Sequence, residues 1–196
     1  MYLFGASGHG KVIKEIVESN GHEIVGFIDD NLDVAEVIGK PVFHEYEGKS
    51  PVIVSIGANA IREKVVNKLN CDFATAVHSK AVVSPSATIG EGTVVMAGVV
   101  VNAETEIGKH SIINTGASVD HECVIGDFVH ISPHVTLCGG VTVGDGTWVC
   151  AGTTVTQGVK IGKWCTIAAG SVVKRNVPDG ALVAGSPAKV LKINKI

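Results

Sequence analysis

The stretch that decides the fold runs from Val83 to Val177, and residues 89–113, IGEGTVVMAGVVVNAETEIGKHSII, show its pattern. An aliphatic residue occupies every sixth position of this stretch without a break, and a small or β-branched residue follows four positions later. An α-helix repeats about every 3.6 residues and a strand about every 2, so neither explains a period of six. A coil with six-residue sides does, because each side turns one aliphatic and one small residue into a narrow interior. The sequence therefore predicts a parallel β-helix built from hexapeptide repeats.

Glycine recurs with a second, longer period of eighteen residues, at Gly90, Gly108, Gly126, Gly144 and Gly162. Eighteen is three times six, so three sides complete one turn and the coil is a three-sided prism. The glycines then form one column along a corner of the prism. Glycine at such a corner indicates either a positive φ angle or a close approach of neighbouring backbone.

Composition narrows the class of protein. The 196 residues carry a formal net charge of −3, which gives no support for binding to nucleic acid or to an acidic membrane. No apolar run approaches the roughly 20 residues of a membrane span, so we expect no membrane insertion. The chain runs from Met1 straight into a folded motif, which indicates no signal peptide and a cytoplasmic protein.

The five cysteines form neither an even set nor a C-x-x-C pair, so they indicate neither a disulfide framework nor a zinc knuckle. Cys123 and Cys165 fall in the inward small-residue positions of the coil and are expected to pack as thiols. A nucleophilic role for Cys138 or Cys150, both at corner positions, stays open.

The N-terminal segment predicts a βαβ unit with a glycine-rich first turn. A short apolar strand leads into residues 5–10, GASGHG, and a helix over residues 11–19 follows before Asn20 and Gly21 stop it. A second strand over residues 23–28 ends at Asp29 and Asp30. Free N–H groups at the helix start favour phosphate, and an acidic residue after the second strand can accept hydrogen bonds from ribose or base.

This pattern favours a nucleotide or nucleotide-sugar site, although a purely structural turn remains an alternative. The spacing is G-x-x-G-x-G and not that of a dinucleotide fingerprint. A strand over residues 51–57 follows and ends at Gly57, and residues 61–69 read as a helix that contains Arg62. Residues 72–77 are a candidate fourth strand. We therefore expect a Rossmann-like α/β domain over residues 1–78, a β-helix over residues 79–196, and a C-terminal cap over residues 181–190.

Polar side chains gather at one place in an otherwise bland coil. His121 occupies an outward position between Asp120 and Glu122, and either carboxylate could orient its imidazole or raise its basicity. Histidine is the side chain suited to proton transfer near neutral pH. His130 lies nine residues later, which is half a turn, so the two histidines should lie on different sides of one prism. They can share a site if coils pack around a threefold axis, and we therefore expect a homotrimer with sites between neighbours.

The chain resembles the bacterial sugar O- and N-acetyltransferases related to sialic acid O-acetyltransferase. The resemblance covers the whole chain and rests on the hexapeptide register, on residues 5–10, on Asp29 and Asp30, and on residues 118–126 (SVDHECVIG) and 185–189 (GSPAK). It is closest to the enzymes that acetylate a UDP-4-amino-sugar in bacillosamine-type glycan pathways. The resemblance implies a left-handed coil and acetyl-CoA as co-substrate, with no metal.

The resemblance also implies roles for individual residues. His121 matches the general base and Glu122 the neighbour that raises its basicity. The substrate-binding positions are Ser7, Gly8, His9, Asp29, Asp30, Gly57 and Asn114, and Arg62 is added from the helix after Gly57. Three positions match contacts to acetyl-CoA, namely His130, Ala151 and Ala169. The expected mechanism is direct acetyl transfer to a neutral sugar amine, with His130 or a backbone N–H stabilising the oxyanion.

Four other functions remain open at this level. O-acetylation of a sialic acid or of a polysaccharide hydroxyl is the nearest alternative. A zinc-dependent β-helix hydratase would draw on His110, His121, His130 and His134, but the histidine spacing of that class is absent. An NAD-dependent reductase would need a longer N-terminal domain with other glycine spacing. A non-catalytic sugar-binding scaffold is the fourth.

Overall fold

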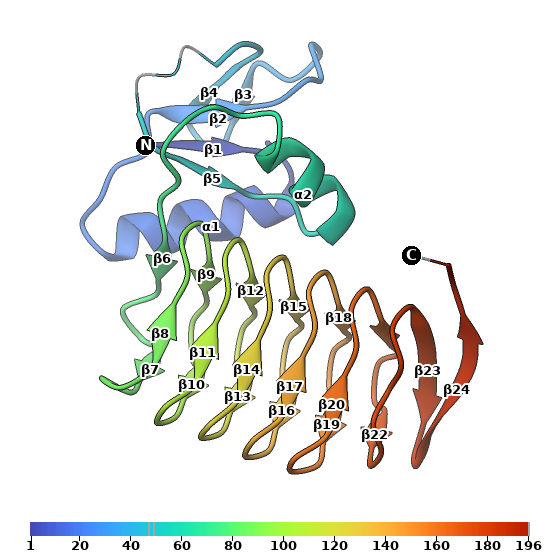
Figure 1. The fold of residues 1–196 in the computed structure, drawn as a ribbon. Helices are drawn as coiled ribbons and strands as arrows, with labels where there is room; N and C mark the ends of the chain where they lie inside the picture. Colours follow the sequence, from blue (N-terminus) through green and yellow to red (C-terminus); the bar gives the residue numbers. More distant parts are fainter. Residues whose placement is uncertain (47, 49, 196) are drawn as a thin grey trace.

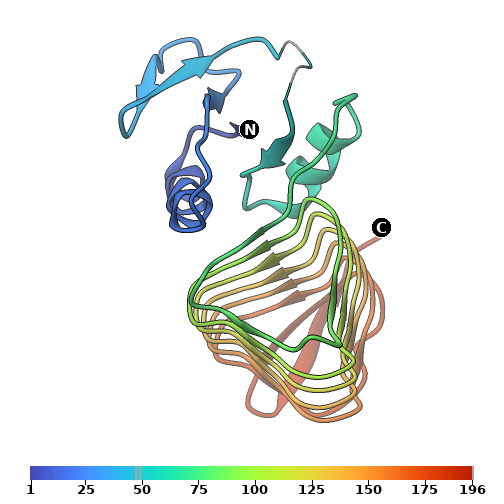
Figure 2. The same cartoon turned by 90° about the vertical axis from the view of Figure 1, so that its left-hand side faces the viewer.

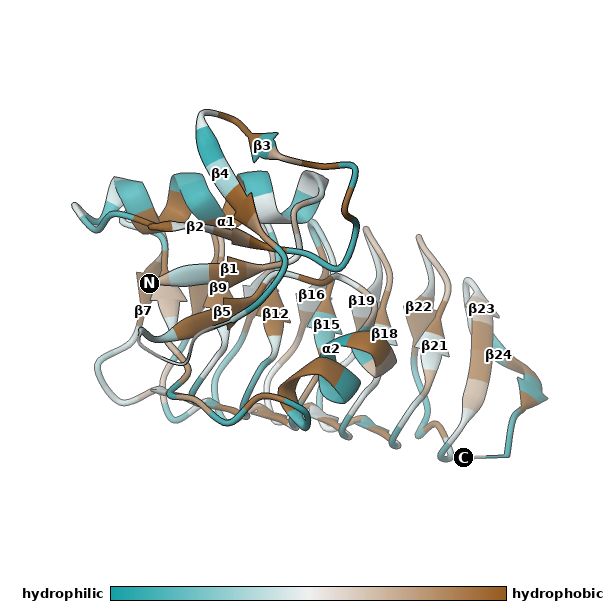
Figure 3. Cartoon of the chain, turned by 90° about the horizontal axis from the view of Figure 1, so that it is seen from above, coloured by the Kyte–Doolittle hydropathy of each residue, from teal (hydrophilic) through white to brown (hydrophobic). Residues whose placement is uncertain are grey.

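The N-terminal domain is a small, mostly parallel sheet between two helices, with β3 pairing antiparallel to β4 at one edge. In the computed structural model, which describes residues 1–46, 48 and 50–195, five strands pair in the order β3-β4-β2-β1-β5. Helices α1 and α2 lie on opposite faces of this sheet (Figures 2 and 3). The bounds of these elements are β1 (Tyr2–Phe4), α1 (Gly8–Ser19), β2 (Gly26–Ile28), β3 (Glu36–Val37), β4 (Lys40–Phe43), β5 (Val52–Val54) and α2 (Asn59–Val66).

Alternation along the strands explains the two helical layers, because successive side chains of a strand point to opposite faces. Leu3, Phe27 and Ile53 are fully buried and belong to the core cluster that includes Ile13 and Ile16 of α1. The flanking Val52 and Val54 belong to a second cluster with Val66 of α2. The expected strands and helices of residues 1–69 are confirmed within a few residues at their ends. The β3–β4 hairpin was not predicted from the sequence.

The rest of the chain winds into a three-sided prism (Figure 2). The eight-stranded side lies next to the N-terminal domain (Figure 1) and is called the domain face below. Its strands are β6 (Ala76–Val77), β9 (Val94–Val95), β12 (Ile112–Ile113), β15 (His130–Ile131), β18 (Trp148–Val149), β21 (Thr166–Ile167), β23 (Ala181–Gly185) and β24 (Ala188–Ile193).

The other two sides are a six-stranded and a five-stranded sheet, and all their strands are parallel. The six-stranded face contains β7 (Val82–Val83), β10 (Val100–Val101), β13 (Ser118–Val119), β16 (Thr136–Leu137), β19 (Thr154–Val155) and β22 (Val172–Val173). The five-stranded face contains β8 (Thr88–Ile89), β11 (Glu106–Ile107), β14 (Val124–Ile125), β17 (Thr142–Val143) and β20 (Lys160–Ile161). The sixfold aliphatic positions fill the interior, as predicted.

The structure shows whether the glycine column is required by a positive φ angle or by close approach of neighbouring backbone. Gly90 has no positive φ, and a Cβ built on it would lie 2.6 Å from the backbone of Gly108 on the next turn. Close approach of the coils is therefore the reason for the column. The positive φ angles fall two residues later, at Gly92, His110 and their equivalents. Six corners hold a residue other than glycine in this conformation, among them Glu122 at φ 57°.

The connection between the domains differs from expectation at one strand. Ala76 and Val77 do form a strand, but they pair with β9 and so begin the domain face instead of extending the N-terminal sheet. Phe73 still forms an isolated parallel bridge to Val52. The solenoid hydrogen bonding thus starts at Ala76, and the domain boundary at residue 78 stays a prediction.

The far end of the coil is covered by an antiparallel pair, β23 and β24, around the cis Ser186–Pro187 peptide. This pair forms at the predicted cap and continues beyond it to Ile193. Among the residues that the structure describes, neither helix has the length and apolar character needed to cross a bilayer.

Candidate active site

Residues of the GASGHG turn lie at the carboxyl edge of the N-terminal sheet, where β1, β2 and β5 end. Asp29 follows β2, and its Oδ2 accepts a hydrogen bond of 2.8 Å from the amide of Ala6. Its carboxylate therefore holds the turn in place, whereas the neighbouring Asp30 is exposed. Ligands of open parallel sheets bind at this edge.

The three glycines of this turn are present for different structural reasons. Gly5 has φ +115°, and a Cβ on Gly10 would overlap the carbonyl oxygen of Gly5, so both are required by the backbone. A Cβ on Gly8 would have no heavy atom within 4 Å. Gly8 and Ser7 are exposed at the start of α1. The open side of the turn therefore leaves room for a ligand at the N-terminus of the helix.

His130 joins the two domains. Its Nδ1 lies 3.3 Å from the carbonyl oxygen of Gly57, and its Nε2 lies 3.1 Å from Nδ2 of Asn114. Both contacts are satisfied by one neutral tautomer, which donates from Nδ1 and accepts at Nε2. Burial, with a smaller contribution from the nearby Arg62 charge, lowers the pKa of His130 to about 4, and the same two causes lower the pKa of His9 to about 4.

The rings of His9 and His130 lie 6.4 Å apart between centroids. The structure therefore brings together His9, Gly57, Asn114 and His130, which are far apart in the sequence. We call these four residues the seam cluster. All four are among the positions that the sequence predicts as substrate or acetyl-CoA contacts.

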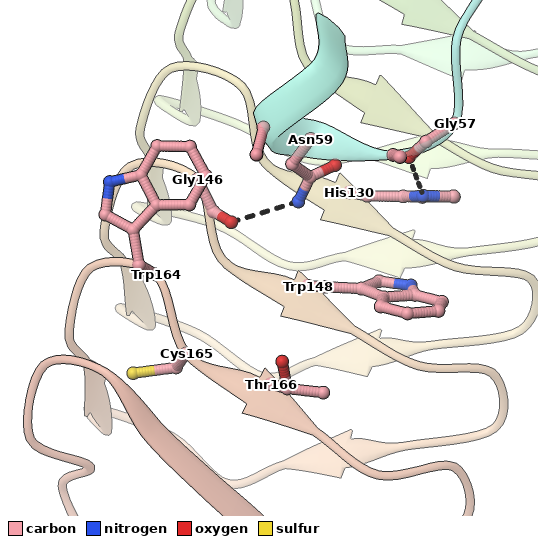
Figure 4. Close-up of a pocket in the computed structure, with 10 residues that line it drawn as sticks. Gly57, Asn59, His130, Gly146, Trp148, Trp164, Cys165 and Thr166 are labelled. Carbon is pink, nitrogen blue, oxygen red and sulfur yellow. Dashed lines mark hydrogen bonds between the residues drawn. The ribbon is translucent and has the colours of Figure 1, made fainter. Parts of the chain in front are cut away.

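A mostly apolar cavity of about 460 Å³ adjoins the seam cluster (Figure 4). Its lining includes Gly57, just before α2, and Asn59, the first residue of α2, together with Trp148, Trp164 and Thr166 from the solenoid. Trp148 is 46% exposed and stacks on His130 at 6.1 Å, and its Nε1–H donates to Oγ of Ser132 at 2.8 Å. Sequence reasoning missed Trp148, although an aromatic residue at an outward strand position of this coil was a signal.

His121 stands on a different part of the prism. It follows β13 and precedes β14, so it lies at the corner opposite the domain face. Its Nδ1 lies 2.9 Å from Oε2 of Glu122, and its side chain is 56% exposed. Asp120 instead accepts hydrogen bonds from the backbone amide of His121 and from Asn102, at 2.8 and 2.9 Å. Glu122 is therefore the carboxylate that orients the ring, and Nε2 remains available as a base.

The imidazole of His121 packs on the next turn of the coil. A Cβ built on Gly139 would lie 2.7 Å from both Cε1 and Nε2 of the ring. The surrounding cleft has a volume of about 590 Å³ and is lined by Asp120, His121, Glu122, Cys138, Gly139, Gly140, Gln157 and Gly158. This cleft and the seam cluster lie across the prism from each other in one chain.

The two alanines predicted to contact acetyl-CoA lie at a third corner of the prism. Ala151 and Ala169 are exposed and follow β18 and β21, one turn apart, and the amide of Gly170 donates to the carbonyl oxygen of Ala151 at 2.9 Å. Their backbone groups are thus presented in a row beside the domain face. The structure keeps this row apart from the His121 cleft of the same chain.

Arg62 requires a correction. We expected it to contact the substrate, but it is 1% exposed and its guanidinium is fully used inside the protein. Its Nη1 donates to the carbonyl oxygens of Ile56 and Gly57, and its Nε donates to that of His110. A side chain without a free donor or exposed surface cannot bind a ligand directly.

The histidines named for a zinc site do not come together in one chain. The His110 ring lies between Phe73 and Phe128, at 4.7 and 5.2 Å. A Cβ on Gly116 would touch the ring of His134 on the adjacent turn. Across residues 1–46, 48 and 50–195, no group of three or more His, Cys, Asp or Glu side chains is placed to hold a metal ion.

Comparison with known proteins gives matches for both parts of the chain. The PglD N-terminal domain profile matches residues 1–69, and the bacterial transferase hexapeptide profile matches residues 140–175. UDP-N-acetylbacillosamine N-acetyltransferase of Bacillus subtilis (strain 168) is 38% identical over 108 residues, which are 48% of this chain and 50% of that protein. The alignment thus spans about half the length of this curated relative.

Solved structures match over nearly the full length. PerB from Caulobacter crescentus, in complex with CoA and GDP-perosamine, is 39% identical with a TM-score of 0.93, covering 97% of this chain and 96% of that one. The acetyltransferase domain of PglB from Neisseria gonorrhoeae FA1090, in complex with acetyl coenzyme A, is 35% identical with a TM-score of 0.89, covering 97% and 98%. The chain therefore belongs to the family of left-handed β-helix, hexapeptide-repeat acyltransferases with a PglD-type N-terminal domain, as its motifs predicted.

Proposed function

We propose that the protein is an N-acetyltransferase that moves an acetyl group from acetyl-CoA to the amine of a nucleotide-linked 4-amino-sugar, with UDP as the nucleotide. The observation that carries the proposal is the His121–Glu122 pair, set in an open cleft on a full-length match to nucleotide-sugar N-acetyltransferases. Nucleotide-sugar binding in the N-terminal domain is supported by the exposed turn at Ser7 and Gly8 and by Asp29 and Asp30, which follow β2 at the same edge of the sheet. Ala151 and Ala169 are the proposed backbone contacts of acetyl-CoA.

The proposed chemistry uses His121 as general base. The neutral amine attacks the thioester carbonyl, and Nε2 of His121 takes the proton that the nitrogen loses as the tetrahedral intermediate forms. Glu122 holds the proton on Nδ1 and stabilises the imidazolium that results. General base catalysis of this kind typically contributes about 10²- to 10⁴-fold. The intermediate then collapses, and coenzyme A leaves as the thiolate.

Stabilisation of the oxyanion is assigned to a backbone N–H rather than to His130. Both ring nitrogens of His130 are already engaged, by Gly57 and Asn114. Its lowered pKa also keeps the ring neutral near pH 7, so it brings no positive charge to the intermediate. We infer that His130 shapes the wall of the substrate site.

A homotrimer is part of the proposal. His121 lies at the corner opposite the domain face, whereas the seam cluster lies on that face, so one chain separates base from proposed substrate by the width of the prism. A neighbouring chain packed alongside can supply the base. Each active site would then take His121 from one protomer and the seam cluster from another.

One assay tests the reaction and its nearest alternative together. Purified protein is supplied with acetyl-CoA and a panel of UDP- and GDP-linked 4-amino-6-deoxy sugars, with free sialic acid as the O-acetylation arm. Release of the CoA thiol and mass analysis of the product are measured. We expect an amide product with a UDP-linked amine. A GDP-linked preference would correct the nucleotide, and an ester product on sialic acid would overturn N-acetylation.

Location is inferred from the substrates. The proposed enzyme would act in the cytoplasm, where nucleotide sugars and acetyl-CoA are both supplied. Cell fractionation with an antibody against the chain measures this directly, and recovery in an extracytoplasmic fraction would contradict it.

A further inference from the structure

Arg62 is a buried cation that meets only neutral groups. It lies in α2, and its three nitrogens donate to five acceptors at 2.7–3.2 Å: the carbonyl oxygens of Ile56, Gly57, His110 and Phe128, and Oδ1 of Asn59. Within the described part of the chain, no carboxylate forms an ion pair with it. The ion pairs of this part lie elsewhere and involve lysine or histidine.

An isolated buried charge is costly, and proteins normally compensate it with an opposite charge. Burial lowers the pKa of Arg62 to about 9, so the guanidinium still carries its charge near pH 7. Five donors on one side chain are available only from a guanidinium, so the bonds to carbonyl oxygens explain the choice of arginine, but they leave its positive charge without a counter-charge. The positive charge of Arg62 can therefore act on an anion only through its electric field, and not by direct contact.

The charge is placed behind the proposed substrate site. Arg62 bonds to the Gly57 carbonyl at 3.2 Å, and the same oxygen contacts His130 of the seam cluster. Its field reaches that cluster, because it contributes to the lowered pKa of both His9 and His130.

We propose that Arg62 is an electrostatic anchor for the diphosphate of the nucleotide sugar, acting through the protein without touching the ligand. The inference rests on the proposed function, because a nucleotide sugar is the anionic substrate that this site would receive. At an effective dielectric constant of about 20 and a separation of about 10 Å, one unit charge strengthens anion binding on the order of tenfold. Arg62 is therefore a positioning residue and not a catalytic one.

Substitutions of Asn59 can distinguish the effect of the Arg62 charge from the effect of the hydrogen bonds between α2 and the solenoid. Its Oδ1 accepts from Nη2 of Arg62 at 2.8 Å, and its Nδ2 donates to the carbonyl oxygens of Gly146 and Thr147 at 3.0 and 3.2 Å (Figure 4 shows the Gly146 contact). Asn59→Asp keeps the acceptor and adds a counter-charge beside Arg62. Asn59→Ala adds no charge. Both variants lose the bonds to the solenoid.

The experiment measures the Kd of UDP and of uridine by calorimetry for wild type, Asn59→Asp and Asn59→Ala. Relative to Asn59→Ala, we expect Asn59→Asp to bind UDP about tenfold more weakly. The two variants should bind uridine equally well, because uridine carries no phosphate. Arg62→Lys should retain most of the UDP affinity that Arg62→Gln loses. Arg175→Met, which removes an exposed arginine near the C-terminal end of the coil, should bind UDP as wild type does. Melting temperatures of all variants establish that they are folded.

Equal UDP affinity in Asn59→Asp and Asn59→Ala would overturn the inference and leave Arg62 as a structural clamp. The inference also fails if uridine binding weakens as much as UDP binding, because uridine carries no phosphate. Failure of the proposed function is a separate result: wild type would then bind UDP in a charge-dependent way without acetylating any amino-sugar. If the accepted nucleotide is GDP, the same comparison is made with GDP and guanosine.

Discussion

At the scale of the residue, the central feature is that corner geometry prepares His121 for its proposed role. Glu122 adopts φ 57°, a conformation that Glu104 shares one turn earlier at φ 58°. The coil therefore presents the same acidic corner twice, and only the later one is preceded by a histidine. This pair provides a matched control for the proposed base.

The first prediction concerns the proposed base, His121, and the carboxylate of Glu122. His121→Ala should lower kcat by about 10²- to 10⁴-fold, because no group would take the proton from the attacking amine. Glu122→Gln should lower kcat less, because the ring stays oriented but its imidazolium loses a counter-charge. Steady-state kinetics with saturating acetyl-CoA measure both. Glu104→Gln is the control and should turn over as wild type, and near-wild-type turnover in His121→Ala would refute the assignment.

A second prediction concerns Gly139, which supports the ring of His121. Ala103 occupies the equivalent corner position two turns earlier, so the backbone there accepts alanine. At Gly139, however, there is no room for a methyl group, because the new Cβ would lie 2.7 Å from the imidazole of His121. Gly139→Ala should therefore reduce kcat while leaving the melting temperature nearly unchanged. A large loss of melting temperature, or wild-type kcat, would show that the glycine has another purpose.

At the scale of the element, α2 determines how the two domains meet. Arg62 reaches the backbone of two successive coil turns, at His110 and Phe128, and Asn59 reaches the third at Gly146. Two side chains from adjacent turns of one helix thus fix α2 along a corner of the prism. The seam cluster depends on this docking, because Gly57 lies just before the helix.

The third prediction is a pH dependence of stability that arises at this seam. His9 and His130 have pKa values of about 4 in the folded protein against 6.5 in the unfolded chain, so the unfolded state binds more protons between these limits. Stability is therefore complete above about pH 6.5 and falls as the pH drops toward 4. Each group contributes on the order of 3 kcal/mol at most.

The free energy of unfolding is measured by chemical denaturation at pH values from about 7.5 to about 4.5. This range covers most of the interval between the pKa of the histidines in the unfolded chain and their pKa in the folded protein. His130→Gln should flatten the dependence, because one of the two titrating groups is removed. His22→Gln, at an exposed position of the loop after α1, is the control and should follow wild type. A wild-type stability that does not change over this range would contradict the proposed burial of neutral rings.

At the scale of the whole molecule, the prism separates the parts that the proposed reaction must join. The fourth prediction follows from this separation: the active enzyme is a trimer with shared sites. His121→Ala should be inactive alone, and so should Gly8→Asp, which places a carboxylate in the turn proposed to bind the nucleotide sugar. Mixed trimers made by co-expression should regain activity, because some sites combine an intact His121 with an intact turn.

Mixing the two purified homo-oligomers without subunit exchange is the control and should stay inactive. The solution mass of wild type, measured by light scattering, should be that of three chains. Complementation would fail if each chain housed its own complete site, and a fully active monomer would also refute the shared arrangement.

The sequence by itself determined the periodic part of this protein. A strict period of six residues predicts a coil with six-residue sides, because each side must bury its aliphatic residue. The glycine period of eighteen residues then sets three sides per turn. The βαβ unit could also be predicted from the sequence, because the signals for its strands, its helix and its glycine-rich turn all lie within about 30 residues. The contact between His121 and Glu122, the proposed base and its carboxylate, could also be expected from the sequence, because the two residues are adjacent and both point away from the core.

Tertiary structure alone decided what lies at the contact between the two parts. Periodicity could not reveal that Arg62 is buried, since an arginine on a short helix is normally exposed, and only docking onto the coil supplies its carbonyl partners. Nor could it reveal the neutral tautomer of His130, which is set by Gly57 and Asn114 from distant segments, or the exposed indole of Trp148 beneath it. These features depend on which surfaces meet in space, and hydrophobic spacing along the chain carries no information about that.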